Sequence, residues 1–324
     1  MIDSATFADF RSLSARLGQD PLRVQGPGGN TSIKDGNTMW IKASGTALAN
    51  AETAEIFVAV DRNAARAEAY GDGDGSCKTT VLDPSNTLRP SIETTFHAAL
   101  NWLVVVHTHS IATLTHAVSS EGHAEAARKL AGLPFAFVPY AKPGLPLTRE
   151  ILAKVTPETQ VIVLQNHGLI CCGKSIPEVA AIMDDVEARL TMPALHALHA
   201  LTPVPDTEPQ DGFQWAEESW LAVDTRATQI VCAGSYYPDH VVFLGPALPQ
   251  YDHDGTPPAI LVNGTGVLLR YGATASQRAM LRCLSDLLSR LPTSWTPDPI
   301  GADAEAELLN WDAEKYRQAL PARS

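Results

Sequence analysis

The sequence predicts an α/β protein, because segments with helical spacing of apolar residues alternate along the chain with short β-branched runs. Apolar side chains recur at helical spacing over residues 6–17, with Ser4 as the expected N-cap. Residues 38–42 alternate as a strand does, and two β-branched runs, residues 103–106 and 161–164, are typical of buried strands.

The remaining pattern predicts two regions. A loop over residues 71–90 leads into a helix that begins near Pro90, and a further helix is expected over residues 176–198. The proline-rich, acidic stretch that follows predicts a boundary between a catalytic domain, residues 1–204, and a C-terminal α/β extension, residues 205–324. In the extension, strands are predicted over residues 229–233, 240–244, 259–262 and 267–270, and a helix over residues 275–291.

Composition excludes several classes of partner. The 324 residues carry 24 basic and 36 acidic side chains, a net charge of −12, which disfavours binding to nucleic acid or to an anionic membrane. The sequence has no apolar run of the roughly 20 residues that span a bilayer and no secretory leader pattern, so a cytoplasmic protein is expected. Its five cysteines have no metal or disulfide spacing and are expected to be reduced.

Three histidines form a candidate metal site. His107 and His109 are two residues apart at the end of a predicted strand, so both imidazoles can face one ion. His167 follows the next apolar strand between small turn residues and supplies a third ligand. Neutral imidazoles favour Zn²⁺, with Mn²⁺, Co²⁺ or Fe²⁺ as alternatives. The alternative for the pair alone is two half-buried structural histidines.

Glu93 is the candidate acid/base. A carboxylate in the first turn of the helix predicted from Pro90 can move a proton beside a metal that polarises a carbonyl. The alternative is that Glu93 serves only the helix terminus.

Three clusters of hydrogen-bond donors could hold an anionic substrate in this acidic chain. Glycine-rich loops leave backbone N–H groups accessible, and lysine, arginine and serine side chains add donors. The candidates are Gly29 and Asn30; Lys42, Ser44 and Gly45; and Arg89 and Ser91.

The segments GGNTS, KASG, RPSIETTFH, HTHS and QNHGLICCG, in this order, resemble the class II aldolase/adducin family over roughly residues 1–200. The motifs are most similar to the aldolase portion of bifunctional rhamnulose-phosphate aldolase/alcohol dehydrogenase-like proteins. The resemblance implies an α/β/α sandwich around a mostly antiparallel sheet. No dehydrogenase is expected in this chain, because Gly264 and Gly266 lack the full dinucleotide-binding fingerprint.

The resemblance also implies site roles. His107, His109 and His167 would hold the metal and Glu93 would be the acid/base. Phosphate or substrate would bind at Gly29, Asn30, Ser44, Gly45 and Ser91. Ile92 departs from the family's Ser-Ser-Glu motif and removes one hydroxyl from the phosphate site, and Tyr140 is a candidate for the family's catalytic tyrosine.

The function implied is reversible retro-aldol cleavage of a sugar, with a sugar phosphate favoured, through a metal-stabilised enediolate. A decarboxylase of a 3-keto sugar-acid phosphate or a pentulose-phosphate epimerase could use the same site, and adducin-like binding without catalysis is a further alternative. Homo-oligomers, tetramers above all, are expected from the resemblance, with a small-molecule substrate as the other partner.

Overall fold

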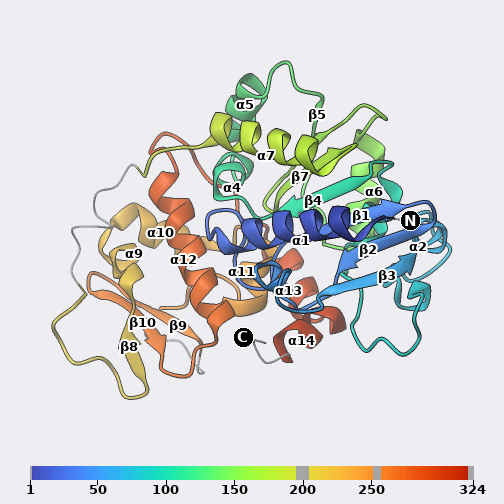
Figure 1. The fold of residues 1–324 in the computed structure, drawn as a ribbon. Helices are drawn as coiled ribbons and strands as arrows, with labels where there is room; N and C mark the ends of the chain where they lie inside the picture. The colour runs from blue at the N-terminus through green and yellow to red at the C-terminus, as the bar shows by residue number, and fades with distance from the viewer. Residues whose placement is uncertain (1, 195–203, 251–256, 320–324) are drawn as a thin grey trace.

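The computed structural model describes residues 2–194, 204–250 and 257–319, which form two sheets surrounded by helices (Figure 1). The strands of the larger sheet are β1 (Asn30–Asp35), β2 (Thr38–Lys42), β3 (Phe57–Asp61), β4 (Val104–Thr108), β5 (Phe135–Val138), β6 (Val161–Leu164) and β7 (Gly168–Gly173). The helices around it are α1 (Ser4–Gln19), α2 (Arg62–Ala69), α3 (Thr94–Ala99), α4 (Ile111–Ala117), α5 (Ser120–Lys129), α6 (Leu145–Lys154) and α7 (Ile176–Leu190), with short 3₁₀ turns at Leu48–Asn50 and Lys78–Thr80.

The larger sheet has the strand order β3-β2-β1-β4-β7-β6-β5. All neighbouring pairs are antiparallel except β5 and β6, which run parallel. The mostly antiparallel sheet that the sequence predicted is therefore confirmed. Because β1 and β7 run opposite to β4, the start of each meets the end of β4, which carries His107.

Successive side chains of the central strands point to opposite faces of the sheet, and a layer of helices packs on each face. Val104 and Val106 pack on one face of the sheet with residues of α1 and α7, while Val105 packs on the other face with α3 and α6. The adjacent Cys171 and Cys172 on β7 divide between the same two layers. Every residue of these central strands is buried, since helices cover both faces. The α/β/α sandwich follows from this alternation.

The C-terminal part forms a smaller three-stranded antiparallel sheet, at the lower left of Figure 1, with the order β8-β10-β9. Its elements are β8 (Phe213–Trp215), a 3₁₀ turn at Glu217–Ser219, α9 (Trp220–Val223), α10 (Thr225–Ala233), α11 (Pro238–Leu244), β9 (Ala259–Val262), β10 (Gly266–Arg270), α12 (Ala275–Arg290), α13 (Ala302–Leu309) and α14 (Asp312–Ala319). Ile111, Leu114 and Val118, in and just after α4, belong to the same buried cluster as this part. The boundary near residue 204 stays a prediction.

Three predicted helices have different limits in the structure. The first begins at Ser4, and Asp3 rather than Ser4 is its N-cap, accepting a hydrogen bond from the Thr6 N–H. The helix expected from Pro90 begins only at Thr94, because Pro90 pairs with Ala43 as an isolated β-bridge. The helix expected over residues 176–198 ends at Leu190, ahead of Pro193; residues 195–198 lie outside the described ranges.

Two predicted strands are wrong. Residues 229–233 lie in α10, whose N-cap Asp224 accepts a hydrogen bond from the Ala227 N–H, and residues 240–244 lie in α11. All seven residues of α11 are buried, so its apolar run has no polar face from which a helical period could be read. The strands expected over residues 259–262 and 267–270 and the helix expected from residue 275 are confirmed as β9, β10 and α12.

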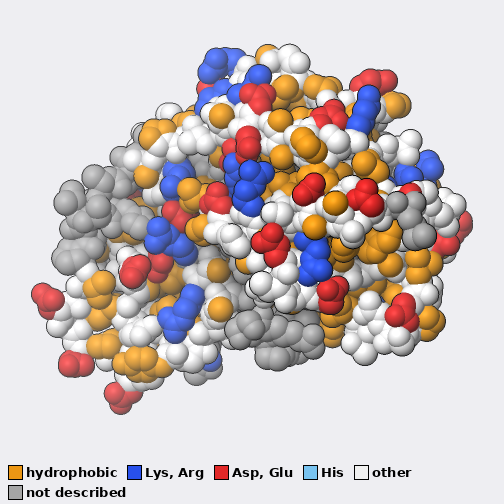
Figure 2. Space-filling model, in the orientation of Figure 1, with side chains coloured by type: hydrophobic (Ala, Val, Ile, Leu, Met, Phe, Trp, Pro, Cys, Tyr) orange, Lys and Arg blue, Asp and Glu red, His pale blue; other side chains and the backbone are white. Residues whose placement is uncertain are grey.

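The surface in the view of Figure 2 mixes acidic and basic side chains, with no extended area of one sign. Within the described ranges, no helix combines the length and apolar character needed to cross a bilayer.

Candidate active site

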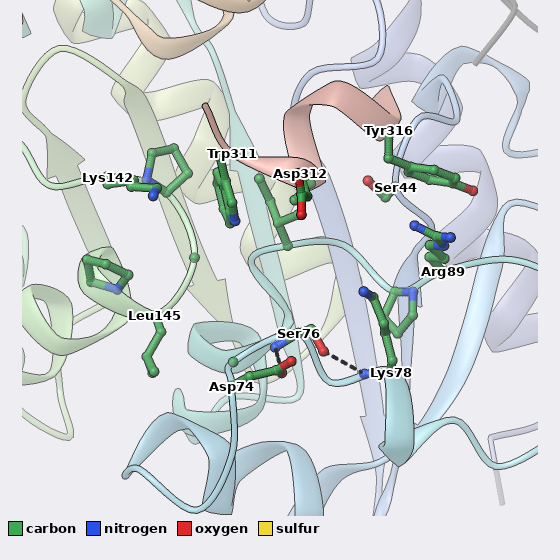
Figure 3. Close-up of a pocket in the computed structure, with 17 residues that line it drawn as sticks. Ser44, Asp74, Ser76, Lys78, Arg89, Lys142, Leu145, Trp311, Asp312 and Tyr316 are labelled. Atoms are coloured by element: carbon green, nitrogen blue, oxygen red, sulfur yellow. Dashed lines mark hydrogen bonds between the residues drawn. The ribbon is translucent and has the colours of Figure 1, made fainter. Parts of the chain in front are cut away.

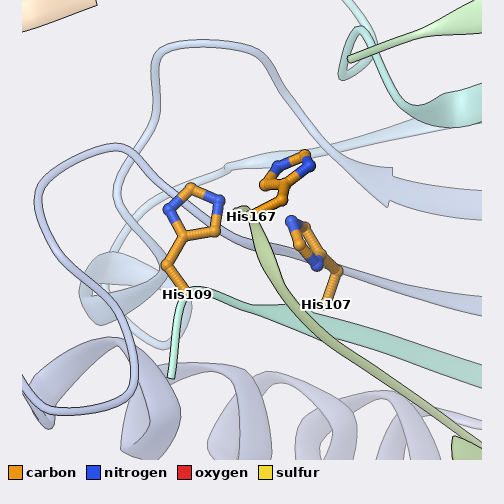
Figure 4. Close-up of side chains that lie close together, drawn as sticks. All are labelled: His107, His109 and His167. Atoms are coloured by element: carbon orange, nitrogen blue, oxygen red, sulfur yellow. The ribbon is translucent and has the colours of Figure 1, made fainter. Parts of the chain in front are cut away.

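The three predicted metal-ligating histidines converge at one end of the central strands of the larger sheet (Figure 4). His107 is in β4, His109 follows that strand directly, and His167 lies in the turn between β6 and β7. Each is buried and offers one ring nitrogen, and these nitrogens lie within 4.8 Å of one another. The ring centroids are 4.9 to 5.4 Å apart. The histidines meet because the end of β4 pairs with the start of β7 in the antiparallel sheet.

Hydrogen bonding leaves the histidines able to act as ligands. The His107 Nδ1–H donates to the Leu169 carbonyl oxygen at 3.0 Å, so Nε2 is the nitrogen that faces the site, and Nε2 has no hydrogen-bond partner among the described residues. Burial lowers the pKa of His109 to about 3 and that of His167 to about 3, so both rings are neutral near pH 7. Neutral imidazoles with free lone pairs are what a divalent cation binds.

Glu93 completes the cluster from the residue just before α3. Its Oε2 is 3.5 Å from His107 Nε2, and its Oε1 is 3.6 Å from His167 Nε2. Asn30 Nδ2 donates to Glu93 Oε2 at 2.8 Å, and the Asn30 oxygen accepts from His97 Nε2. Ser91 Oγ accepts from the Glu93 N–H at 3.2 Å. The carboxylate is therefore held in place between two of the imidazoles.

The glycine-rich loop before β1 approaches these histidines closely. A Cβ atom at Gly28 would lie 2.7 Å from His109 Nδ1, and one at Gly29 would lie 2.9 Å from the His107 carbonyl oxygen. Gly29 also has a φ of +60°, which other residues rarely adopt. A side chain at either position would displace the loop from the site.

The predicted anion-binding residues divide into two groups. A cavity of about 30 Å³ beside the histidines is lined by Gly29, Asn30, Ser44, Gly45 and Ser91, together with Lys42 and Ile92. Within it, Asn30 Nδ2 donates to both Ser91 Oγ and Glu93. Arg89 and Tyr140 do not line this cavity.

Lys42 is engaged in holding the loops. Its ammonium group donates to the carbonyl oxygens of Pro27 at 2.8 Å and Thr46 at 2.6 Å. Burial, with a contribution from nearby Arg317, lowers the pKa of Lys42 to about 7. Tyr140 lies outside the cavity: its hydroxyl is buried and has no hydrogen-bond partner within the described ranges, and burial raises its pKa, as do Glu307 and Glu305.

The C-terminal part adds two charged side chains that sequence reasoning missed. Asp239, from α11, places Oδ2 3.6 Å from His109 Nδ1, and Arg317, from α14, binds both oxygens of Asp239 at 2.9 and 3.1 Å. Glu314 accepts from the same guanidinium at 2.9 Å. Burial would raise the pKa of Asp239, but Arg317 and then His109 hold it below its usual range. Asp239 and Arg317 both line the small cavity beside the histidines.

The turn that carries His167 is also held by the C-terminal part. Asn166 has a φ of +51°, and its Nδ2 donates to the carbonyl oxygens of Tyr236 at 3.1 Å and Asp298 at 2.9 Å. Two of the three histidines are thus positioned by residues beyond position 204. No spacing in the sequence indicated these contacts, because they join segments about 70 and 130 residues apart.

Known proteins resemble part of the chain. The L-fuculose phosphate aldolase of Methanocaldococcus jannaschii is 25% identical over 182 residues, 55% of this chain and 91% of that protein. The 3-oxo-tetronate 4-phosphate decarboxylase of Escherichia coli K12 is 30% identical over 113 residues, 31% of this chain and 52% of that protein. The uncharacterized oxidoreductase YuxG of Bacillus subtilis is 29% identical over 178 residues, 49% of this chain but only 25% of that protein.

The fold is also found in a solved structure. The N-terminal class II aldolase domain of a conserved protein from Thermoplasma acidophilum matches with a TM-score of 0.52 and 26% identity, over 59% of this chain and 94% of that one. A family model described as the class II aldolase and adducin N-terminal domain matches residues 13–192. Because that match covers more than half of the chain, the chain belongs to the class II aldolase and adducin family.

Proposed function

We propose that the chain is a divalent-metal-dependent carbon–carbon lyase that cleaves a sugar or sugar phosphate by a reversible retro-aldol reaction. The observation that carries this proposal is the Glu93 carboxylate lying between the Nε2 atoms of His107 and His167 at 3.5 and 3.6 Å. This arrangement unites potential metal ligands and a proton carrier in one buried site.

The residues fit a divalent cation. His107 Nδ1 is occupied by the Leu169 carbonyl, so Nε2 is the ring nitrogen that faces Glu93 Oε2, 3.5 Å away. In the part of the chain that the structure describes, His107 Nε2 and Glu93 Oε1 are both buried and lack hydrogen-bond partners, a costly arrangement that a bound cation would relieve. Three imidazoles beside a carboxylate base are a donor set that favours Zn²⁺ and also suits Mn²⁺, Co²⁺ or Fe²⁺.

A cation held there would polarise substrate oxygens and stabilise the negative charge that develops on them. The chain's own contribution is to move a proton. In the cleavage direction, the Glu93 carboxylate accepts the proton of the hydroxyl whose carbon becomes the aldehyde, while the carbon–carbon bond breaks toward the neighbouring carbonyl. The protonated Glu93 then returns this proton to the carbon of the released ketone fragment. Asn30 and Ser91 orient the carboxylate for both transfers.

Decarboxylation of a 3-keto sugar-acid phosphate is a second candidate. It is favoured by the 30% identity to a 3-oxo-tetronate 4-phosphate decarboxylase. The same site could stabilise the charge left when CO₂ departs, after which Glu93 would supply a proton to the carbon. The two reactions differ in the products they release, an aldehyde in one and CO₂ in the other.

The first experiment is elemental analysis of the purified chain and its His109→Ala variant. We expect about one divalent metal ion per wild-type chain and loss of most of it in the variant, since a ligand is removed. His123→Ala is the matched control, because His123 lies on α5 outside the cluster, where it donates to the Ala117 carbonyl and contacts the Phe137 ring. Metal-free wild type that also takes up no added Zn²⁺ or Mn²⁺ would contradict the proposal and favour an adducin-like binding role.

Turnover is then measured with the metal-loaded chain on sugar phosphates and keto-acid phosphates, recording aldehyde and CO₂ separately. Glu93→Gln is expected to lower kcat by about 100-fold or more, because the amide keeps the shape but cannot carry the proton. Unchanged kcat in this variant would remove Glu93 from the mechanism.

A further inference from the structure

A second and larger cavity adjoins the histidine site, with a volume of about 500 Å³ (Figure 3). We call it the basic-aromatic cavity, because Lys78, Arg89, Lys142, Trp311 and Tyr316 line it. Its volume falls within the range of small-molecule sites, whereas the 30 Å³ cavity at the histidines admits little more than a water molecule. Ser44, Ile92 and Pro143 line both cavities, so the two are neighbours.

The three cations in this cavity form no close ion pair with a carboxylate in residues 2–194, 204–250 and 257–319. Two of them lie over aromatic rings instead: the Arg89 guanidinium is 3.8 Å from the centre of the Tyr316 ring, and the Lys142 ammonium is 4.8 Å from that of Trp311. An aromatic face positions a cation without neutralising it, so its N–H groups stay available to a ligand.

The acidic residues in the lining have local partners. Asp74 Oδ1 accepts from the Ser76 N–H at 2.8 Å, and Asp312 lies 3.7 Å from Lys315. Hydrogen bonds from Ser76 lower the pKa of Asp74, and the nearby Lys78 lowers it further. Three basic and two acidic side chains line the cavity, so it is locally basic in a chain whose net charge is −12.

The geometry points to the basic-aromatic cavity as the binding site for the phosphate group of a phosphate monoester, the far end of the substrate whose other end reacts at Glu93. This inference rests on the proposed function. Ile92 explains why the phosphate group would bind beyond the histidine cavity. It lines both cavities, and its apolar side chain offers no hydroxyl to an anion there. A guanidinium and two ammonium groups beyond Ile92 provide a planar pair of donors and two point charges, which suit a phosphate dianion.

In both cation–π pairs of this cavity, the aromatic ring comes from the C-terminal part. Trp311 directly precedes α14, and Tyr316 lies within it. The residues that hold Arg89 and Lys142 in place are thus outside the region matched by the family model, which ends at residue 192. The substrate preference of this chain would accordingly be set by its C-terminal part.

The test is calorimetric titration of inorganic phosphate into the metal-free chain at fixed ionic strength. A parallel titration with acetate tests whether a carboxylate binds as well as phosphate. Arg89→Gln is expected to weaken phosphate binding by about tenfold or more, as for the loss of a charged hydrogen-bond donor. Tyr316→Leu is expected to weaken it less, because the cation remains. Lys154→Gln makes the same charge change at an exposed site on α6 and should leave the affinity within about twofold of wild type.

Equal phosphate affinity in wild type and Arg89→Gln would overturn the inference, as would an equal loss in Lys154→Gln or tighter binding of acetate than of phosphate. Because the titration uses metal-free chain, absence of lyase turnover leaves a positive phosphate result standing. Conversely, turnover without Arg89-dependent phosphate binding would retain the proposed function and reject this site.

Discussion

Glu93, His107 and Asn30 show how single residues depend on one another at this site. Asn30 uses its amide nitrogen for Glu93 and Ser91 and its oxygen for His97, so a residue predicted to bind substrate also orients the carboxylate. The three histidines and Glu93 could be singled out from the sequence, because a His-x-His pair at a strand end constrains its own geometry. Asp239 and Arg317 could not, since their contacts depend on how distant segments pack.

Asp239 is expected to act as a positioning residue for His109. A carboxylate next to a metal-ligating histidine fixes the ring, and removing it typically costs 10- to 100-fold in metal affinity. Asp239→Asn should therefore weaken Zn²⁺ binding by about tenfold, measured by competition with a chromophoric chelator. Asp185→Asn on the exposed side of α7 is the charge-matched control. Unaltered Zn²⁺ affinity in a folded Asp239→Asn protein would show that the 3.6 Å contact has no such role.

At the scale of elements, the β6–β7 hairpin brings His167 to the same end of the sheet as His107 and His109. Leu164 pairs with Gly168, so only Gln165, Asn166 and His167 form the turn. The sequence predicted β6 and the small residues of this turn, because both are local properties. It failed for α10 and α11, where buried packing makes a helix from β-branched residues whose local preference is for strands.

Asn166 provides a test of that hairpin. Asn166→Ala loses the bonds to the Tyr236 and Asp298 carbonyls and also places alanine at a φ of +51°, whereas Asn166→Gly loses only the bonds. We expect each to lower the free energy of unfolding by about 1 to 3 kcal/mol, with alanine about 1 kcal/mol worse than glycine. Urea unfolding measures both. Equal stabilities of the two variants would indicate that the turn relaxes out of the left-handed conformation.

At the scale of the whole molecule, the two sheets are joined by a shared core and by polar contacts at the histidine site. The α4 side chains Ile111 and Leu114 pack with residues of the C-terminal part, and Asn166 and His109 contact it directly. Local sequence patterns could predict an α/β protein, and composition could predict its acidic charge. Neither could predict this coupling, because the contacting apolar surfaces have no complementary pattern in the sequence.

Several buried neutral histidines should make the metal-free molecule sensitive to acid. Burial lowers the pKa of His109 and His167 to about 3 and that of His116 and His240 to about 4, and it also lowers that of His97. In the unfolded chain these groups titrate near pH 6.5, so below that pH the unfolded state binds more protons. Stability is thus fully present above about pH 6.5 and falls toward pH 4.

His116→Asn isolates one of these groups, since asparagine keeps a donor near the Ala112 carbonyl but takes up no proton. Between pH 6.5 and 4, this variant should lose up to about 3 kcal/mol less stability than wild type, at roughly 1.4 kcal/mol per pH unit. Chemical denaturation of metal-free protein at both pH values gives the comparison. Parallel losses in the two proteins would mean that other groups govern the acid transition.

The neighbouring thiols of β7 give the molecule two built-in chemical reporters. Cys171 faces the layer of α1 and α7, and Cys172 faces that of α3 and α6, although a single peptide bond joins the two residues. Burial raises the pKa of both thiols, that of Cys172 to about 12, so the reactive thiolate is scarce while both layers stay closed. Alkylation at one position and not the other would therefore identify which layer of the sandwich opens first.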